Sequence, residues 1–502
     1  MPDRQPSARL DPKPGAIIGG WQLGVIAAAL SYLVLRLLYL ALHIDPAIPP
    51  DEITHAGFAQ HQLAFWGLPA DTTDSQVLGL VSHRPFLYSW VLARWLGLHA
   101  AVSSIAGPEL VSGVVSELVW LRLANIGLAL ITVLAGLAFA RRAGATAGAC
   151  ALFVVVLTNT PMWSFLSASV NYDNAAMALA TLCFALLARY LDAPSPRTAC
   201  LLLSAALAGV LTKTAFLPLA ALIATAALTA RRTAPLRDAV AGLRAPGATG
   251  FGAVGILLLL GALAVGIYGR NLAKFGLLEP APNQVLELEA ANQNRIFRQE
   301  HVLRSFRAGA IDYRQAVAEI DGIEHEGDRA GAMWMLRRAR ELRDGTGEPL
   351  MGRVAYAGVW TPLIAERLFG VMGHRALYKS APLATAYGLC AAFGLLALAW
   401  RVRQPGVHLR TAAGIGAAYA LILMQAVNYP MYVASGIEVE AIQARYLFPV
   451  FAPLLAACIV AAREVLPERA RLPLGIAVGA LFVFGDFPYF ITNASAEWFG
   501  VP

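Results

Sequence analysis

Runs of about 20 apolar residues recur along this chain, and they constrain its fold more than any other feature of the sequence. A helix needs roughly 20 consecutive apolar residues to cross the hydrocarbon core of a bilayer. With 58% of its residues hydrophobic and only 14% charged, the chain falls outside the usual balance of a soluble domain. We therefore expect an all-α fold, a polytopic transmembrane helical bundle.

Hydropathy predicts about eleven spans. They lie near residues 20–42, 118–140, 145–166, 173–190, 198–212, 214–230, 249–268, 381–400, 411–428, 445–462 and 472–492. The first apolar run is too long for a signal peptide and lacks a small-residue cleavage site, so we expect it to remain as an anchor.

Basic residues gather in the loops on one side of these spans. They lie before the first span and in segments 141–142, 189–197, 231–244, 401–410 and 463–471. Because short cytoplasmic loops are enriched in Lys and Arg, this pattern predicts a cytoplasmic N-terminus and extracytoplasmic loops opposite. The same bias accounts for much of the net charge of +7, which is therefore a poor indication of nucleic-acid binding.

Two long polar segments interrupt the spans. Residues 43–117 contain ITHAGFAQHQLAFWG and PFLYSWVLARWLG, whose aromatic and Leu residues at helical spacing predict interfacial helices. Residues 269–380 carry alternating charge with few Gly or Pro, which predicts a helical extracytoplasmic cap. The expected organisation is a cytoplasmic tail at 1–19, an N-terminal transmembrane module at 20–268, the loop region at 269–380 and a C-terminal transmembrane module at 381–502.

The most informative short stretch is PPDEITH, which follows the first span. Its two prolines end that span, and Asp51 and Glu52 then open a helix. In one interpretation Asp51 is only an N-cap. In the other it is a general base that removes the proton of an acceptor hydroxyl, with Glu52 as a second catalytic carboxylate. Because a helix N-terminus favours the charged form, the base is expected to be ionised and weak.

His55 follows Asp51 and Glu52 by about one helical turn. These three residues could bind a divalent metal such as Mg or Mn, with His61 as a candidate for a fourth ligand. The alternative is a polar histidine at the membrane interface without a metal. No cofactor is otherwise indicated, because the five cysteines lie in or beside apolar runs and show no metal or disulfide spacing.

A second polar motif, SASVNYDNAAMALATL, opens the span near residue 173 at the same membrane level as Asp51. Asp173 is either the N-cap of that span or, together with Asn171, part of a substrate pocket that orients a substrate or a metal. The motif therefore allows a pocket lined by two carboxylates, Asp51 and Asp173.

Three cations lie at the outer boundary of the spans: Lys213 in LTKTAFLP, Arg270 in YGRNLAKFG and Arg445 in IQARYLFP. A cation at this depth either snorkels to water or pairs with an anion. Three cations around one surface suit a lipid phosphate or pyrophosphate headgroup, whose charge grows as it leaves. Arg84, before PFLYSW, could contact the same headgroup.

The DE pair with His55, the interfacial helices after it and the NYD motif resemble the GT-C superfamily of polytopic glycosyltransferases over most of the chain. GRN, ERLFGVMGHRALY and QARYLFP are similar to a bacterial branch of membrane proteins with a GT-C-like fold. The resemblance implies a polyprenyl-phosphate sugar donor, inversion at the anomeric carbon, Asp51 as the base and Arg445 on the lipid phosphate. The chain departs from the branch in having QAR where a glycine usually precedes the arginine, and in lacking an acidic motif in the long loop.

The expected function is therefore transfer of a hexosyl or pentosyl group to an envelope glycan, lipid or protein on the outer face of the bacterial inner membrane. The expected partners are the lipid-linked donor, that acceptor and membrane lipids, without nucleic acid. The alternative is a transporter or flippase of a lipid-linked or anionic substrate, which also needs many spans and buried cations. Most candidate charges lie at the outer boundary rather than at the midplane, which favours surface chemistry; Asp486 in the last span is the exception. A scaffold for envelope assembly would need none of these carboxylates.

Overall fold

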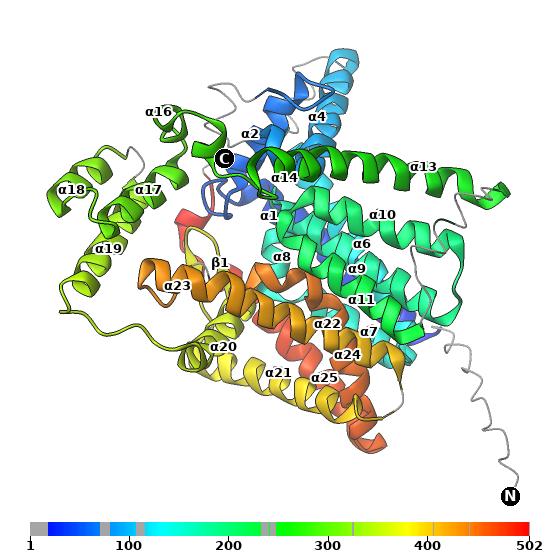
Figure 1. The fold of residues 1–502 in the computed structure, drawn as a ribbon. Coiled ribbons are helices and arrows are strands. Elements are labelled where there is room, and N and C mark those ends of the chain that lie inside the picture. The colour runs from blue at the N-terminus through cyan, green and yellow to red at the C-terminus, as the bar shows by residue number, and fades with distance from the viewer. Residues whose placement is uncertain are drawn as a thin grey trace, which may run out of the picture.

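The computed structural model describes residues 19–70, 81–106, 116–231, 240, 247–323, 326–404, 406–440 and 442–500. The described chain is almost entirely helical (Figure 1). Its α-helices are α1 (Trp21–His43), α2 (Glu52–Leu63), α4 (Leu87–Ala106), α6 (Glu117–Arg142), α7 (Ala147–Thr158), α8 (Pro161–Ser167), α9 (Tyr172–Asp192), α10 (Pro196–Thr212), α11 (Leu217–Arg231), α13 (Gly247–Ala264), α14 (Arg270–Phe275), α15 (Pro282–Val285), α16 (Leu288–Ala291), α17 (Arg295–Arg307), α18 (Tyr313–Asp321), α19 (Glu326–Arg343), α20 (Arg353–Phe369), α21 (Ala381–Arg401), α22 (Val407–Ile422), α23 (Tyr429–Ser435), α24 (Phe448–Val465), α25 (Glu468–Gly485) and α26 (Phe487–Asn493).

Short elements of other kinds connect these helices. Four are 3₁₀ turns, η1 (Val81–His83), η2 (Thr214–Phe216), η5 (Ala444–Leu447) and η6 (Ala496–Trp498), and two are π-helical segments, η3 (Val265–Gly269) and η4 (Leu423–Asn428). Strands β1 (Val371–Met372) and β2 (Ala376–Leu377) form a small antiparallel hairpin in which Val371 pairs with Leu377.

Within the described residues, eight helical segments are long and apolar enough to cross a bilayer. The pair α7 and α8, bent by 68° at its break, adds a ninth if it is counted as one broken span. The apolar helices α10 and α11 are shorter, and they coincide with the two shortest predicted spans. The structure thus confirms a polytopic helical bundle, and the count of eleven spans stays a prediction.

The bundle has two chemically different ends. At one end Asp192, the last residue of α9, accepts hydrogen bonds from Arg142 and from the His408 ring, each at 2.8 Å. Arg401 and Glu464 form an ion pair between the C-terminal parts of α21 and α24. We call this the basic end, and we call the opposite end, where α9 begins at Tyr172, the site end. The basic tail before residue 19 lies outside the described residues.

Helix α9 lies in the middle of the bundle and is the most enclosed of the candidate spans, because 78% of the residues in its most apolar stretch are buried. Its sequence is rich in small residues, and Ala175, Ala176, Ala180 and Cys183 are all buried. Small side chains let neighbouring helices approach closely, so α6, α10 and α24 all pack on α9. The start of this helix is therefore held firmly at the site end.

The first long loop forms two helices, α2 and α4, at the positions of the two predicted amphipathic stretches. They pack on each other through a small cluster that includes Ala59 and Leu92, while Trp66 and Ile105 stay exposed at 78% and 87%. Figure 1 shows α4 lying across the direction of α13 rather than along it. This is the arrangement expected of interfacial helices with an apolar outer face.

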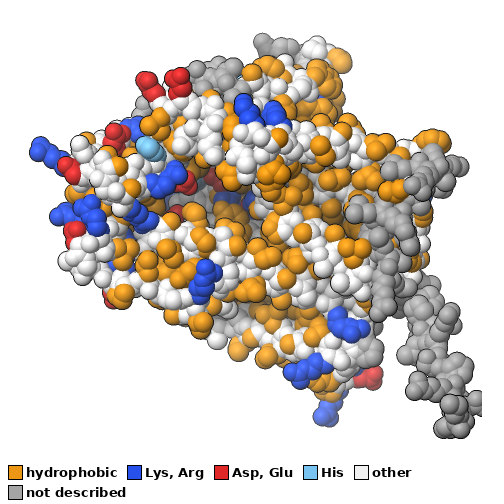
Figure 2. Space-filling model, in the orientation of Figure 1, with side chains coloured by type: hydrophobic (Ala, Val, Ile, Leu, Met, Phe, Trp, Pro, Cys, Tyr) orange, Lys and Arg blue, Asp and Glu red, His pale blue; other side chains and the backbone are white. Residues whose placement is uncertain are grey.

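The segment between α14 and α21 also folds as helices, as its charge pattern predicts. Helices α17, α18 and α19 share a core of their own that includes Phe306, Ile320 and Leu336. Figure 2 shows charged side chains gathered over this lobe and hydrophobic side chains covering much of the bundle beside it. Arg338 joins the lobe to the bundle by donating to the Gly436 carbonyl at 3.1 Å.

Candidate functional site

Asp51 stands at the start of α2 in an unusual conformation. Its φ of 61° is left-handed, and among the described residues no other non-glycine residue has a positive φ. Its side chain makes no capping hydrogen bond, although its backbone carbonyl accepts from the His55 N–H at 2.9 Å. Instead the carboxylate accepts a hydrogen bond from Arg445 Nη2 at 2.8 Å. The structure therefore contradicts the N-cap interpretation of Asp51, and it leaves this carboxylate at the surface of the bundle.

Arg445 links Asp51 to a second ion pair, that of Asp173 and Lys213. It lies in η5, just before α24, and its Nε is 3.6 Å from Asp173 Oδ2. The other oxygen of Asp173 is 2.5 Å from Lys213 Nζ, and the Lys213 ammonium also lies over the Tyr172 and Tyr446 rings. Four charges from the starts of α2 and α9, from η5 and from the end of α10 thus alternate in sign along one row.

This row of charges has unused hydrogen-bonding capacity. Nε and Nη1 of Arg445, Oδ2 of Asp173 and Nε2 of His55 are all buried and have no hydrogen-bond partner. A buried polar atom without a partner costs roughly 1–3 kcal/mol, so native proteins rarely leave several together unless a ligand or water uses them. The arrangement can therefore receive a polar ligand that both accepts and donates hydrogen bonds.

The same neighbours influence the charge of Asp51 and of His55. Burial acts to raise the pKa of Asp51, but the charge and hydrogen bond of Arg445, with smaller contributions from His55 and His374, hold this pKa below its ordinary value. Burial lowers the pKa of His55 to about 4, although the charges of Asp51 and Asp173 oppose that shift. At neutral pH the site therefore contains an ionised Asp51 and a neutral imidazole that packs on Tyr172.

Asn171, rather than Asp173, caps the start of α9. Its Oδ1 accepts from the Asp173 N–H at 2.9 Å, so Asn171 and not Asp173 is the N-cap of α9. Its Nδ2 donates to the Pro50 carbonyl at 2.9 Å, which fastens the PPDE segment to the start of α9. The Asp173 side chain is thus left for the cations Arg445 and Lys213, while Asn171 is buried and positions both loops.

Glu52 is enclosed rather than available to a substrate. It is 1% exposed; Arg122 donates to its two oxygens at 2.9 and 2.6 Å, and the Val170 N–H donates to it at 2.7 Å. Arg122 also donates to the carbonyls of Ala41 and Ile44 at the end of α1. The geometry therefore gives Glu52 a positioning role and not the expected catalytic one. An arginine inside an apolar run was the signal for a buried carboxylate partner.

The expected metal ligands do not converge. Glu52 faces Arg122 and Asp51 faces Arg445, so His55 has no second free ligand beside it. In the part of the chain that the structure describes, no group of three His, Cys, Asp or Glu side chains could hold a metal ion. The expected trio of Asp51, Glu52 and His55 is therefore not assembled as a metal site in this structure.

Arg270 and Arg84 belong to a neighbouring cluster. Arg270 donates to the Ser82 carbonyl and lies 3.1 Å from the His83 ring nitrogen, and Arg84 pairs with Glu279 at 3.2 Å. Asn271 in α14 donates to the His83 carbonyl at 2.8 Å. These contacts tie η1 to the start of α14, and the cations that meet Asp51 and Asp173 are Arg445 and Lys213.

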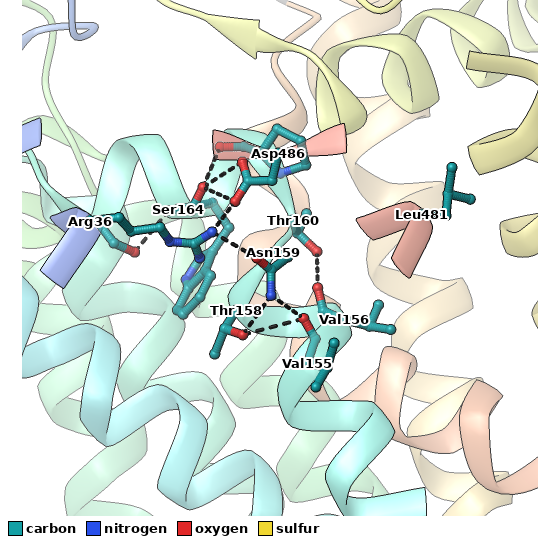
Figure 3. Close-up of polar contacts among 12 residues, drawn as sticks. Arg36, Val155, Val156, Thr158, Asn159, Thr160, Ser164, Leu481 and Asp486 are labelled. Carbon is teal, nitrogen blue, oxygen red and sulfur yellow. Dashed lines mark hydrogen bonds and ion pairs between the residues drawn. The ribbon is translucent and has the colours of Figure 1, made fainter. Parts of the chain in front are cut away.

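A second buried charge pair lies deeper in the bundle, where two helices break (Figure 3). Arg36 of α1 donates to Asp486 at the break between α25 and α26, and to Asn159 Oδ1 at 2.9 Å at the break between α7 and α8. Ser164 donates to Asp486 at 3.1 Å, and the Asn159 amide donates to the Val155 carbonyl at 2.7 Å. Asn159 thus satisfies a backbone carbonyl at the end of α7. Inside a bilayer such a group needs a partner within the protein, because no water is available to it.

These features define the chain as a polytopic helical membrane protein with a cluster of acidic and basic side chains at one end of its bundle. No family model matches it, and no curated protein matches it in sequence. Solved structures do match. Archaeal oligosaccharyltransferase AglB from Archaeoglobus fulgidus, in complex with an inhibitory peptide and a dolichol-phosphate, is 13% identical over 96% of this chain and 56% of its own, with a TM-score of 0.48.

A further match is ArnT from Cupriavidus metallidurans in the apo state, which is 13% identical over 88% of this chain and 78% of its own, with a TM-score of 0.37. The first neighbour is named as an oligosaccharyltransferase, and both matches run along most of this chain. The chain spans little more than half the length of the oligosaccharyltransferase. At 13% identity and TM-scores below 0.5, neither match transfers a residue or an activity to this chain.

Proposed function

We propose that this protein is an inverting glycosyltransferase that moves a sugar from a polyprenyl-phosphate donor to an envelope glycan, lipid or protein on the extracytoplasmic face of a bacterial inner membrane. The observation that carries the proposal is the pair of Asp51 and Arg445 at the site end. The Asp51 side chain is 34% exposed and caps no helix, and Arg445 beside it has buried N–H groups without partners. One residue can accept a proton, and the other can bind a phosphate.

The reaction needs an acceptor hydroxyl to lose its proton as it attacks. In the proposed step the hydroxyl oxygen bonds to the anomeric carbon while the bond from that carbon to the phosphate oxygen breaks on the opposite face. The hydroxyl proton goes to Asp51, and polyprenyl phosphate leaves with the bonding electrons. A base of this kind contributes roughly 10²- to 10⁴-fold to the rate.

The Arg445 contacts also suggest how a weak base becomes stronger when the donor binds. Without donor, the hydrogen bond from Arg445 keeps the pKa of Asp51 low. A phosphate that binds Arg445 competes with Asp51 for the same guanidinium, and Asp51 then loses part of the interaction that favours its charged form. Lys213, 15% exposed and held by Asp173, is the second cation close enough to compensate the growing charge of the leaving group.

The direct test is transfer by the purified chain in proteoliposomes supplied with a polyprenyl-phosphate sugar and candidate acceptors. Asp51→Asn should abolish transfer without changing expression or membrane insertion, because the side chain caps no helix. Asp45→Asn, an aspartate of the same loop whose carboxylate accepts from the Ala47 N–H at 2.8 Å, is the matched control and should keep activity. Full activity of Asp51→Asn would refute the assignment of the base.

A transporter or flippase is the second candidate, and one observation favours it. Arg36 pairs with the buried Asp486 at the junction of α25 and α26 and bonds Asn159 at the bent junction of α7 and α8. Transporters use broken helices and buried charges in this way. The two candidates differ in product: a flippase moves a labelled lipid-linked sugar across proteoliposomes without breaking its glycosidic bond. Translocation without any release of polyprenyl phosphate would favour this candidate over the transferase.

A further inference from the structure

The segment from Arg367 to Leu377 passes between the two loops that carry Asp51 and Arg445. It contains the end of α20 and the β1–β2 hairpin, and it covers most of the ERLFGVMGHRALY stretch of the sequence. Phe369 fixes the first part of the segment in the core by stacking on the Tyr387 ring, with centroids 4.9 Å apart. None of the chemistry proposed above uses this segment.

Its first anchor holds the loop before Arg445. The Arg367 guanidinium, 6% exposed, donates to the Val439 carbonyl at 3.2 Å and also to the Ile442 carbonyl. Ile442 lies three residues before Arg445 and is fully buried. Arg367 is thus the side chain that fixes the backbone from which η5 starts. Its charge also opposes the rise in the pKa of Glu440 that burial causes in the same loop.

Its second anchor holds the loop before Asp51. The His374 N–H donates to the Ile48 carbonyl at 2.9 Å, and Ile48 lies three residues before Asp51. The contact is so close that a Cβ at Gly373 would lie 2.0 Å from the Ile48 oxygen. Only glycine fits here. The hairpin is itself fixed to α8, because the Met372 N–H points to the Met162 sulfur at 3.3 Å.

We infer that Arg367 and Gly373 are positioning residues that together set the spacing of Asp51 and Arg445, one acting on the phosphate-binding loop and the other on the loop of the base. The two anchors are six residues apart, and residues 367–371 between them are buried, so both loops are held by one rigid piece of chain. This inference rests on the proposed function. The two anchors should have different kinetic effects, because Arg367 holds the loop of Arg445 and Gly373 holds the loop of Asp51.

Kinetics in proteoliposomes with a polyprenyl-phosphate sugar separate these effects. Arg367→Gln should raise the donor KM, because Arg445 loses its support, and Gly373→Ala should lower kcat by about 100-fold at an unchanged donor KM, because the base shifts. Matched controls lie at the start of the same helix. Arg353→Gln removes an arginine that bonds Gln425, Gly352→Ala adds a Cβ with nothing within 4 Å, and both should behave as the parent protein.

A second measurement does not depend on activity. Cysteines at Ile48 and His374 should form a disulfide rapidly on oxidation in membranes, and Gly373→Ala in that background should slow its formation by at least about tenfold, whereas neither single cysteine variant cross-links. No cross-link, or an unchanged rate with Gly373→Ala, would overturn the second anchor. If Asp51→Asn abolishes transfer while Arg367→Gln and Gly373→Ala match their controls, the inference fails and the proposed function stands. If the parent protein transfers no sugar but the cross-link behaves as described, the proposed function fails instead.

Discussion

Arg445 Nη2 lies 2.8 Å from the Asp51 carboxylate, although the two residues are 394 positions apart in the chain. The contact joins the first loop after α1 to the turn before α24, and Asp173 and Lys213 extend it into the bundle. The proposed base and the proposed phosphate-binding cation are thereby held next to each other. Preorganised charge of this kind is what stabilises a transition state without reorganisation at the moment of reaction.

Glu52 and Asp51 are neighbours with opposite consequences on substitution. Glu52→Gln leaves the buried Arg122 without its charged partner, and breaking a buried pair costs about 3–5 kcal/mol. We expect a lowered unfolding temperature and poor recovery from membranes for this variant. Thermal unfolding of purified protein in detergent checks it, with Glu117→Gln, an exposed glutamate that bonds Gln60, as the control. Normal stability combined with lost transfer would instead support a catalytic Glu52.

The difference between these two acids shows what the sequence can and cannot reveal. Composition and periodicity predict the helical bundle and the interfacial helices, because burial of apolar faces decides both, and the distribution of Lys and Arg predicts the outer position of Asp51. The partners of each carboxylate depend on contacts between segments that are far apart in the chain. Arg122 lies 70 residues from Glu52 and Lys213 lies 40 residues from Asp173, and no local pattern encodes those distances.

The same limit explains why the sequence predicts a metal trio and N-caps that the structure does not contain. Asp51, Glu52 and His55 have ligand spacing on a helix, but two buried arginines from other elements turn the two carboxylates in different directions. Asn171, two residues before Asp173, competes successfully for the cap of α9 because its side chain reaches the Asp173 N–H directly. Side chains at a helix start can be assigned only when every donor nearby is known.

Arg445→Lys is expected to impair use of the donor more than use of the acceptor. Lysine keeps the charge but lacks the planar fork with which Arg445 contacts Asp51 and Asp173 and is proposed to bind the donor phosphate. Loss of one hydrogen bond between charged groups predicts a donor KM about 10- to 100-fold higher, with a smaller change in the acceptor KM. Initial rates at varied donor concentration measure this effect. Arg270→Lys, in the neighbouring cluster, is the control, and an unchanged donor KM for Arg445→Lys would argue against the phosphate role.

The buried pair of Arg36 and Asp486 allows the transferase and the transporter to be distinguished. Arg36→Met should destabilise the protein by about 3–5 kcal/mol because Asp486 is left buried and unpaired, and Arg36→Met with Asp486→Leu should recover part of that loss. Thermal unfolding of the two variants measures the recovery. A transferase should keep sugar transfer in the double variant once it folds. A transporter that needs this pair should lose translocation even when stability is restored.

His55 gives the protein a stability that depends on pH. Its pKa is about 4 in the folded protein, because it is buried, and its ordinary value is 6.5. Below pH 6.5 the unfolded chain therefore binds a proton at His55 that the folded chain does not bind. Each further drop in pH favours unfolding until the folded imidazole also becomes protonated near pH 4. The free energy of unfolding falls by about 3 kcal/mol over this pH range.

Unfolding temperatures measured between pH 7 and pH 4 should fall more steeply for the parent protein than for His55→Gln. His61→Gln, in the same helix and half-buried, should follow the parent protein. Equal slopes for the parent protein and His55→Gln would show that His55 is not held neutral beside Asp51.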